Sequence, residues 1–301
     1  MIQHLTIPRG PFELAADLHR PDNDAPPRTV VLSTPGSSVK EQIGANYASR
    51  LAARGITALT FDPAHQGRSG GEPRDLEDPY RRGEDLSYAI DALSTIDGID
   101  AERIGVLGIC AGGGYAVHTA RTDHRIKAVG TVVPVNMGTS FRSFHPSDPA
   151  SALDDMAAGR TEENRSGALT RVNWLPDSLD EAAAAGLTDI DTTQAITYYR
   201  TERGRNEHST NRRLSRGDAL LLGYDAFHMV ETLLTQPLQV VLAGRRGNTG
   251  SYEAGTRLWE LAPNPVDLMV IDGAGHYELY DDPRYVDPAA DRLATFFSKH
   301  L

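Results

Sequence analysis

The sequence predicts an α/β protein with a mostly parallel sheet, helices on both faces and a helical cap insertion. Three observations support this prediction. Short apolar runs alternate with amphipathic helical segments up to about residue 133. The alternation resumes at about residue 238, and the segment between these two parts carries no clear strand. Strands joined through helices run parallel with right-handed crossovers, so the two parts are expected to share one sheet.

The first part of the core begins with two strands in residues 1–20. Their apolar and polar positions roughly alternate, as in half-buried antiparallel strands. A polar, proline-rich turn follows at 20–28. After it, continuous apolar runs predict strands buried on both faces, and amphipathic patterns predict helices. In chain order we expect a strand at 29–34, a helix at 41–54, a strand at 56–61, a helix at 84–96, a strand at 103–109, a helix at 112–122 and a strand at 126–133.

The second part of the core returns to the same alternation. It is expected to contain strands at 238–244 and 267–271 and helices at 252–261 and 289–300. We therefore assign residues 1–136 and 237–301 to the core, and residues 137–236 to a helical cap inserted after the sixth strand. Loops at the carboxyl ends of parallel strands surround the ligand crevice, so an insertion there is expected to cover a site.

Composition excludes several classes of function. The chain has 301 residues, of which 40% are hydrophobic and 24% charged, and its net charge of −11 argues against a nucleic-acid partner. No apolar run approaches the ~20 residues that cross a bilayer, and the N-terminal residues are not expected to be a signal peptide. A single cysteine excludes an intramolecular disulfide and a cysteine-rich metal site. We expect no metal, no cofactor, no membrane partner and a cytoplasmic location.

The segment Gly108-Ile-Cys110-Ala-Gly112 lies where a strand is expected to end and a helix to begin. It matches the G-x-S-x-G nucleophile elbow, with cysteine in the serine position. Such a turn exposes Sγ above the sheet and points the Ala111 N–H at a developing oxyanion. It also places Sγ at a helix N-terminus, which is expected to lower the thiol pKa. The alternative is that Cys110 is an ordinary buried core cysteine.

The base and the second oxyanion donor are expected in two other loops. In an elbow fold the chain order is nucleophile, acid, histidine, and His276 follows the last predicted strand in a glycine-rich loop. Position favours His276 over the other nine histidines. The loop at 35–38 follows the strand at 29–34, and the Ser37 N–H is the expected second donor. A simple tight turn is the alternative for this loop.

No carboxylate occupies the position where the sequence pattern predicts the acid of a catalytic triad. The loop after the strand at 238–244 contains no Asp or Glu before Glu253, and Asn248 occupies the expected position. Cys–His–Asn arrangements exist, so Asn248 is a candidate for orienting the imidazole. Asp62, Glu253 and Glu278 are the alternatives.

These motifs together resemble a branch of the α/β hydrolases with a cysteine nucleophile, which includes the YcjY-like hydrolases and the fungal polyketide transferases. The chain resembles dienelactone hydrolase more distantly. The segments that carry the resemblance span nearly the whole chain and lie at 35–42, 61–74, 103–115, 198–204 and 273–281. The resemblance implies the α/β-hydrolase fold, Cys110 as nucleophile and His276 as base.

The chain departs from that family pattern at several positions. The family often has Gly where this chain has Ser37 and Ser38, and often has Asp at Asn136 and near Asn248. It tends to have Asp where this chain has Glu278. These departures leave the acid open and allow a specialised activity.

The leading hypothesis is acyl transfer, as a hydrolase or an acyltransferase, from an ester, thioester or lactone through a thioester on Cys110. Aromatic residues and a histidine of the insertion are candidates for binding an apolar, polyketide-type acyl group: Phe141, Trp174, Tyr198 and His228. The alternative is that the aromatic residues form the cap's own core. A small-molecule acyl substrate is the expected partner, and a carrier protein or a homodimer is left open.

Two other functions are compatible with the same scaffold. One is a ligand-binding protein without catalysis, because a fold does not determine a function. The other is a lyase or cyclase that transfers protons without acylating Cys110. The acylation of Cys110 separates the leading hypothesis from both.

Overall fold

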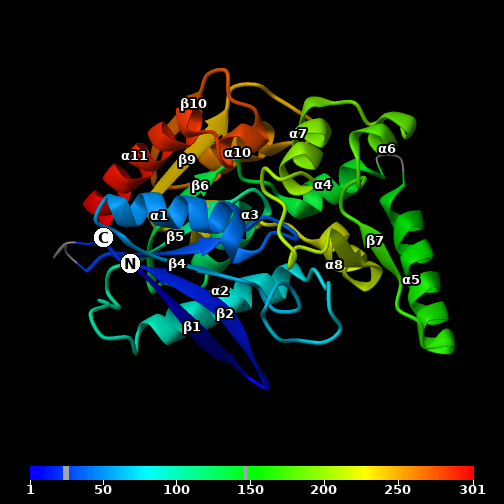
Figure 1. Cartoon of the computed structure of the whole chain (residues 1–301), viewed down its shortest axis with the longest axis horizontal. Coiled ribbons are helices and arrows are strands. Elements are labelled where there is room, and N and C mark those ends of the chain that lie inside the picture. Colours follow the sequence, from blue (N-terminus) through cyan, green and yellow to red (C-terminus); the bar gives the residue numbers. More distant parts are fainter. Residues whose placement is uncertain (23–26, 146–147) are drawn as a thin grey trace.

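An eight-stranded sheet forms the core of the chain in the computed structural model, which describes residues 1–22, 27–145 and 148–301 (Figure 1). Residues 23–26 of the expected turn at 20–28 lie outside the described residues. The strands are β1 (Ile2–Arg9), β2 (Phe12–His19), β3 (Thr29–Ser33), β4 (Thr57–Phe61), β5 (Ile104–Ile109), β6 (Ile126–Val132), β9 (Leu238–Ala243) and β10 (Pro265–Ile271). They confirm the predicted α/β alternation.

The strand order is β1-β2-β4-β3-β5-β6-β9-β10. β1 pairs antiparallel with β2, and β2 antiparallel with β4, whereas all later neighbours pair in parallel. The central strands β3, β4, β5 and β9 are buried along their whole length, which explains their continuous apolar sequences. The carboxyl ends of the parallel strands therefore meet at one edge of the sheet.

Helices cover both faces of this sheet. One face carries η1 (Lys40–Gly44), α1 (Ala45–Ala53) and α11 (Pro283–His300), and the other carries α2 (Pro79–Leu93), α3 (Ala111–Ala120) and α10 (Ser251–Leu261). Two buried hydrophobic clusters match the two faces. Leu51 and Phe297 belong to the first, and Leu86 and Val117 to the second.

Two helices begin earlier than the sequence patterns predict. α2 begins at Pro79 rather than 84, and α11 begins at Pro283 rather than 289. In each, an Asp N-cap precedes a Pro: the Asp78 carboxylate accepts the N–H of Tyr80, and the Asp282 carboxylate caps α11 in the same way. The Asp-Pro pair is itself a helix start, and it extends each helix beyond its amphipathic stretch.

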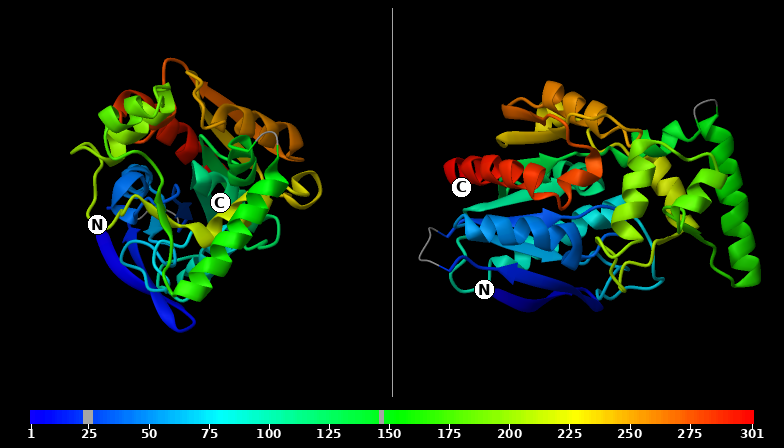
Figure 2. Two further views of the ribbon diagram at one scale, coloured as in Figure 1. Left: turned by 90° about the vertical axis from the view of Figure 1, so that its right-hand side faces the viewer. Right: turned by 45° about the horizontal axis from the view of Figure 1, so that its top comes forward.

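The segment between β6 and β9 gathers at one end of the sheet, beyond the core helices (Figures 1 and 2). Its helices are α4 (Met137–Ser143), α5 (Pro149–Ser166), α6 (Leu179–Ala184), α7 (Ile190–Tyr199), α8 (Asp218–Gly223) and α9 (Val230–Leu233), with the turn η2 (Ser215–Gly217). We call this segment the cap. Among the described residues, no helix is both long and apolar enough to cross a membrane.

The cap also contains a small sheet that the sequence analysis did not predict. β7 (Arg171–Asn173) pairs antiparallel with β8 (Arg212–Leu214). Each strand has three residues, which is too short for an alternating pattern to stand out. The pair ties together two distant parts of the cap.

Two glycines on either side of Cys110 allow close backbone packing: Gly108 lets α3 approach β5, and Gly112 lets α3 approach the end of β3. A Cβ atom on Gly112 would overlap the Ser33 carbonyl oxygen, and one on Gly108 would overlap the Gly112 carbonyl oxygen. Both neighbours are backbone atoms, which cannot rotate away. The spacing of the two glycines therefore reflects packing of backbone on backbone.

Replacing Gly112 with Ala should destabilise the fold by about 1–3 kcal/mol or more, because the new methyl group has no space. The matched control is Gly159→Ala in α5, where a Cβ meets no atom within 4 Å. That change should stabilise the protein by about 0.5–1 kcal/mol through helix propensity. Urea unfolding curves of both variants measure the difference, and equal midpoints would contradict the packing argument.

Candidate active site

Cys110 occupies a strained backbone conformation between β5 and α3. Its φ of 54° and ψ of −124° lie in a region that residues with a Cβ rarely adopt. Three backbone hydrogen bonds hold it there. The Cys110 N–H donates to Val132 O at 3.0 Å, and the Cys110 carbonyl accepts from Gly113 and Val135, both at 2.9 Å. The turn is thus fixed to β6 as well as to α3.

Cys110 is partly exposed as a residue, but the surroundings of its thiol group keep that group protonated. Burial raises the pKa of Cys110 to about 11, although hydrogen bonds from the Tyr280 hydroxyl and the Ala111 N–H act in the opposite direction. The nearby Asp191 charge raises it further. The expectation of a lowered thiol pKa is therefore wrong for this structure, because desolvation outweighs the helix N-terminus.

The loop after β3 lies beside the elbow, because β3 and β5 are neighbours in the sheet. Ser37 has a left-handed φ of 56°, and its N–H has no hydrogen-bond partner among the described residues. The Ser38 N–H instead donates to Pro35 O at 3.3 Å, and the buried Arg82 guanidinium donates to the same oxygen at 3.2 Å. From the cap, Ser209 Oγ donates to Ser37 O at 2.8 Å. The Ser37 N–H is thus available for an oxyanion.

His276 begins the short helix η3 (His276–Leu279), which follows β10. Its side chain is 1% exposed. Nδ1 lies 3.0 Å from Ser251 Oγ, and Nε2 lies 3.3 Å from the Tyr280 hydroxyl. Because Tyr280 also hydrogen-bonds the thiol, its hydroxyl connects His276 to Cys110. This pattern fits a neutral imidazole with the proton on Nδ1.

Burial also controls the protonation of His276. It lowers the pKa of His276 to about 4, and the charge of Asp191 opposes this shift in part. Both partners are therefore uncharged at neutral pH, as thiol and imidazole. Such a pair needs transfer of the thiol proton during attack rather than a thiolate formed beforehand.

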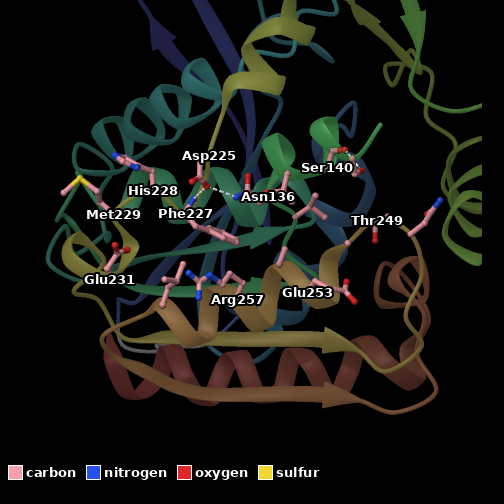
Figure 3. Close-up of a pocket in the computed structure, with 17 residues that line it drawn as sticks. Asn136, Ser140, Asp225, Phe227, His228, Met229, Glu231, Thr249, Glu253 and Arg257 are labelled. Atoms are coloured by element: carbon pink, nitrogen blue, oxygen red, sulfur yellow. Dashed lines mark hydrogen bonds between the residues drawn. The ribbon is translucent and has the colours of Figure 1, made fainter. Parts of the chain in front are cut away.

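Asn248 does not orient His276 in this structure. Its side chain is exposed and lines a pocket of about 730 Å³ between α4, α9 and α10 (Figure 3). The pocket wall includes Asn136, hydrogen-bonded to Asp225 at 2.8 Å, and His228, but neither Cys110 nor His276. The hydroxyls of Thr249 and Ser251, farther along the same loop, occupy the place beside Nδ1 instead.

The three alternative carboxylates are engaged elsewhere. Asp62 accepts the N–H of Lys40 at 2.7 Å, and burial raises its pKa to about 6. Glu278 accepts the Gly275 N–H at 2.7 Å and pairs with Arg245 of the loop after β9. Glu253 is largely exposed. Asp62 and Glu278 thus fix their own loops, and none of the three hydrogen-bonds His276 among the described residues.

The carboxylate that reaches this region comes from the cap. Asp191, in the first turn of α7, is 1% exposed. Its Oδ2 accepts both the N–H of Thr249 at 2.9 Å and the Thr249 hydroxyl at 2.8 Å. A Cβ on Gly247 would overlap this carboxylate. Sequence reasoning missed Asp191 because only tertiary packing brings the cap to this loop.

The cap places aromatic side chains around the same edge. The Trp174 ring would lie 3.3 Å from a Cβ on Gly36, so it covers the oxyanion loop, and Phe141 packs edge-on against it at 6.4 Å. Tyr198 packs against Tyr280 with ring centroids 5.1 Å apart, and the next residue, Tyr199, belongs to the same buried cluster, against which Cys110 packs. Of the residues expected to bind substrate, Trp174 lies closest to the oxyanion loop.

Comparisons with known proteins agree with this architecture. A model described as the alpha/beta hydrolase family matches residues 35–289. The uncharacterized protein YcjY of Escherichia coli (strain K12) is 39% identical over 280 residues, covering 91% of this chain and 89% of that protein.

Two further relatives extend the comparison. The crystal structure of hypothetical protein PA2218 from Pseudomonas aeruginosa superimposes with a TM-score of 0.86 at 29% identity, over 100% of this chain and 94% of that one. A protein named acyltransferase drtE, of Aspergillus calidoustus, is 23% identical over 89% of this chain and 86% of its own length.

Cys110 should react slowly with iodoacetamide at neutral pH, and the rate should rise only above the free-cysteine range near ~8.5, because burial disfavours the thiolate. Cys110 is the single cysteine, so the mass gain measured at each pH reports on it alone. Protein unfolded in urea is the control and should follow an ordinary thiol. Half-maximal labelling of the folded protein below about pH 7 would contradict the raised pKa.

Proposed function

The chain belongs to the alpha/beta hydrolase family, and on that premise we propose that it is an acyl-transfer enzyme that works through a thioester on Cys110. The strained elbow carries this proposal: a thiol held at a left-handed φ and connected through one hydroxyl to a buried imidazole. A strained backbone conformation persists only where the surrounding structure enforces it, and such conformations are concentrated at active sites. The expected substrates are esters, thioesters or lactones.

The first half of the reaction forms the thioester. Sγ of Cys110 attacks the carbonyl carbon while its proton passes to Nε2 of His276, and the carbonyl oxygen becomes an oxyanion. The N–H groups of Ala111 and Ser37 are the donors for that oxyanion. When the tetrahedral intermediate collapses, the bond to the leaving oxygen or sulfur breaks, and that atom takes the proton from the imidazolium.

The second half releases the acyl group. Water, an alcohol or an amine gives its proton to His276 and attacks the thioester carbonyl. Collapse then breaks the C–S bond, and Cys110 takes the proton back as a thiol. Hydrolysis and transfer share every residue of this cycle, and the acceptor decides between them.

The surroundings of the thiol favour an apolar acyl group. Trp174 covers the oxyanion loop, with Phe141 behind it, and Tyr199 belongs to the buried cluster against which Cys110 packs. The name of the relative drtE supports acyl transfer, and a polyketide-type acyl chain fits an aromatic lining. We therefore propose an apolar acyl donor that enters beneath the cap.

Acylation of Cys110 is the direct test. We expect the wild-type protein to gain the mass of one acyl group when it is mixed with p-nitrophenyl esters or acyl thioesters of increasing chain length. Cys110→Ala should gain none and should lose turnover. His276→Gln should slow turnover by about 10²–10⁴-fold, because it removes the base.

Two outcomes would overturn the proposal. Turnover that survives in Cys110→Ala would show that the site works without a thioester on Cys110. Binding of substrates by wild type with neither adduct nor turnover, across the ester and thioester series, would identify a ligand-binding protein. Thermal unfolding of each variant confirms that it is folded.

The pH dependence follows from the buried imidazole. His276, whose pKa is lowered to about 4, acts as a base only when unprotonated. We expect kcat/KM to be flat between about pH 6 and 8 and to fall only as the pH approaches that pKa. An acid limb centred near the free-histidine value of about 6.5 would contradict the effect of burial.

A further inference from the structure

Asp191 is a buried carboxylate without a cationic partner among the described residues. Oδ2 accepts two hydrogen bonds from Thr249, whereas Oδ1 has no hydrogen-bond partner in the part of the chain that the structure describes. Burying a carboxylate without an opposite charge is costly, even after local relaxation. Such a carboxylate would stabilise a positive charge that forms nearby only during a reaction.

A chain of hydroxyls joins this carboxylate to His276. Nδ1 of His276 lies 3.0 Å from Ser251 Oγ, Ser251 Oγ lies 3.3 Å from Thr249 Oγ1, and Thr249 Oγ1 lies 2.8 Å from Asp191 Oδ2. Each hydroxyl has one proton to donate. A carboxylate only accepts, so the single proton of the Thr249 hydroxyl goes to Asp191; a continuous chain then requires Ser251 to donate to Thr249 and Nδ1–H to donate to Ser251.

The direction of this chain fixes the tautomer of His276. Nδ1 must carry the proton, so Nε2 keeps its lone pair toward Tyr280 and the thiol. A second, shorter route exists, because Nδ1 also lies 3.3 Å from Thr249 Oγ1. Both routes pass through Thr249 and end on Asp191.

Charges around the imidazole single out the same residue. The titratable groups around His276 are the ring of Tyr277, the ring and hydroxyl of Tyr280, and the carboxylate of Asp191. The charge of Glu278, on the same short helix, is neutralised by an ion pair with one arginine. Removing the charge of Asp191 should therefore destabilise the imidazolium form of His276.

The cap helix holds Asp191 in place from both ends. The Asp189 carboxylate caps α7 by accepting the Thr192 N–H at 3.0 Å, and this leaves Asp191 in the first turn, where the helix dipole favours a negative charge. At the other end of α7, Tyr199 packs against Tyr277 at 6.3 Å. α7 therefore lies against η3 along the loop that carries the base.

We propose that Asp191 is the positioning carboxylate of the Cys110–His276 pair and acts through Thr249 and Ser251. The inference rests on the proposed function, since it assigns the third member of the same site. The orienting role that was expected for Asn248 is thereby assigned to a residue of the cap. The nucleophile and the base come from the core and the carboxylate from the cap, so the set is complete only when α7 is seated on η3.

The test compares Asp191→Asn with the matched control Asp189→Asn on the same helix, since asparagine also caps helices. In Asp191→Asn we expect kcat/KM for a p-nitrophenyl ester to fall roughly 10- to 100-fold, less than the ~10⁴-fold loss at a directly bonded triad aspartate. Asp189→Asn should keep wild-type kcat/KM. Long-range ¹H–¹⁵N NMR of His276 should report the Nδ1–H tautomer in wild type and a mixture in Asp191→Asn.

Thr249→Val provides a second route to the same answer, because it removes the hydroxyl link of the chain but keeps the Asp191 carboxylate and its hydrogen bond from the Thr249 N–H. It should reduce kcat/KM to a similar extent, and the double variant should lose no more than the larger single effect, because both act on one chain. Unchanged kcat/KM and an unchanged tautomer in both single variants would overturn this inference. If wild type instead forms no thioester on Cys110, the proposed function itself fails, so the two failures are distinguishable.

Discussion

The left-handed turn at Cys110 is the constraint on which the rest of this site depends. Backbone hydrogen bonds to β6 and α3 hold it, and two glycines allow α3 to pack against β5 and against the end of β3 without side chains between them. The same turn places Sγ at the carboxyl edge of the sheet, where the loops after β3 and β10 also begin. The oxyanion loop and His276 thus converge on the thiol because parallel strands end together.

Burial sets the chemistry that this geometry can perform. Burial of the thiol and the imidazole raises the pKa of Cys110 and lowers that of His276. The uncharged thiol and imidazole react only when a carbonyl substrate is bound, because the imidazole must take the thiol proton during the attack. In this account the cap supplies both the apolar lining and the carboxylate of Asp191, so covering the site and completing it are one event.

The features that follow from local sequence were predictable. The elbow at Cys110, the position of His276 and the alternating strands rest on residues close together in the chain, and the structure has them where expected. The features that depend on contacts between distant segments were missed. Nothing near Asp191 in the sequence indicates that it will lie against Thr249, and a thiol at a helix N-terminus gives no sign that burial will outweigh the dipole. Asn248 was a reasonable choice by position, but its side chain turns outward.

A crystal structure of the protein trapped with an activated acyl donor would show directly whether Cys110 carries the acyl group. We expect continuous density from Sγ of Cys110 to the acyl carbon, with the carbonyl oxygen within hydrogen-bond distance of the N–H groups of Ala111 and Ser37. An acyl group bound without a covalent link in an active crystal, or attached to another residue, would contradict this expectation.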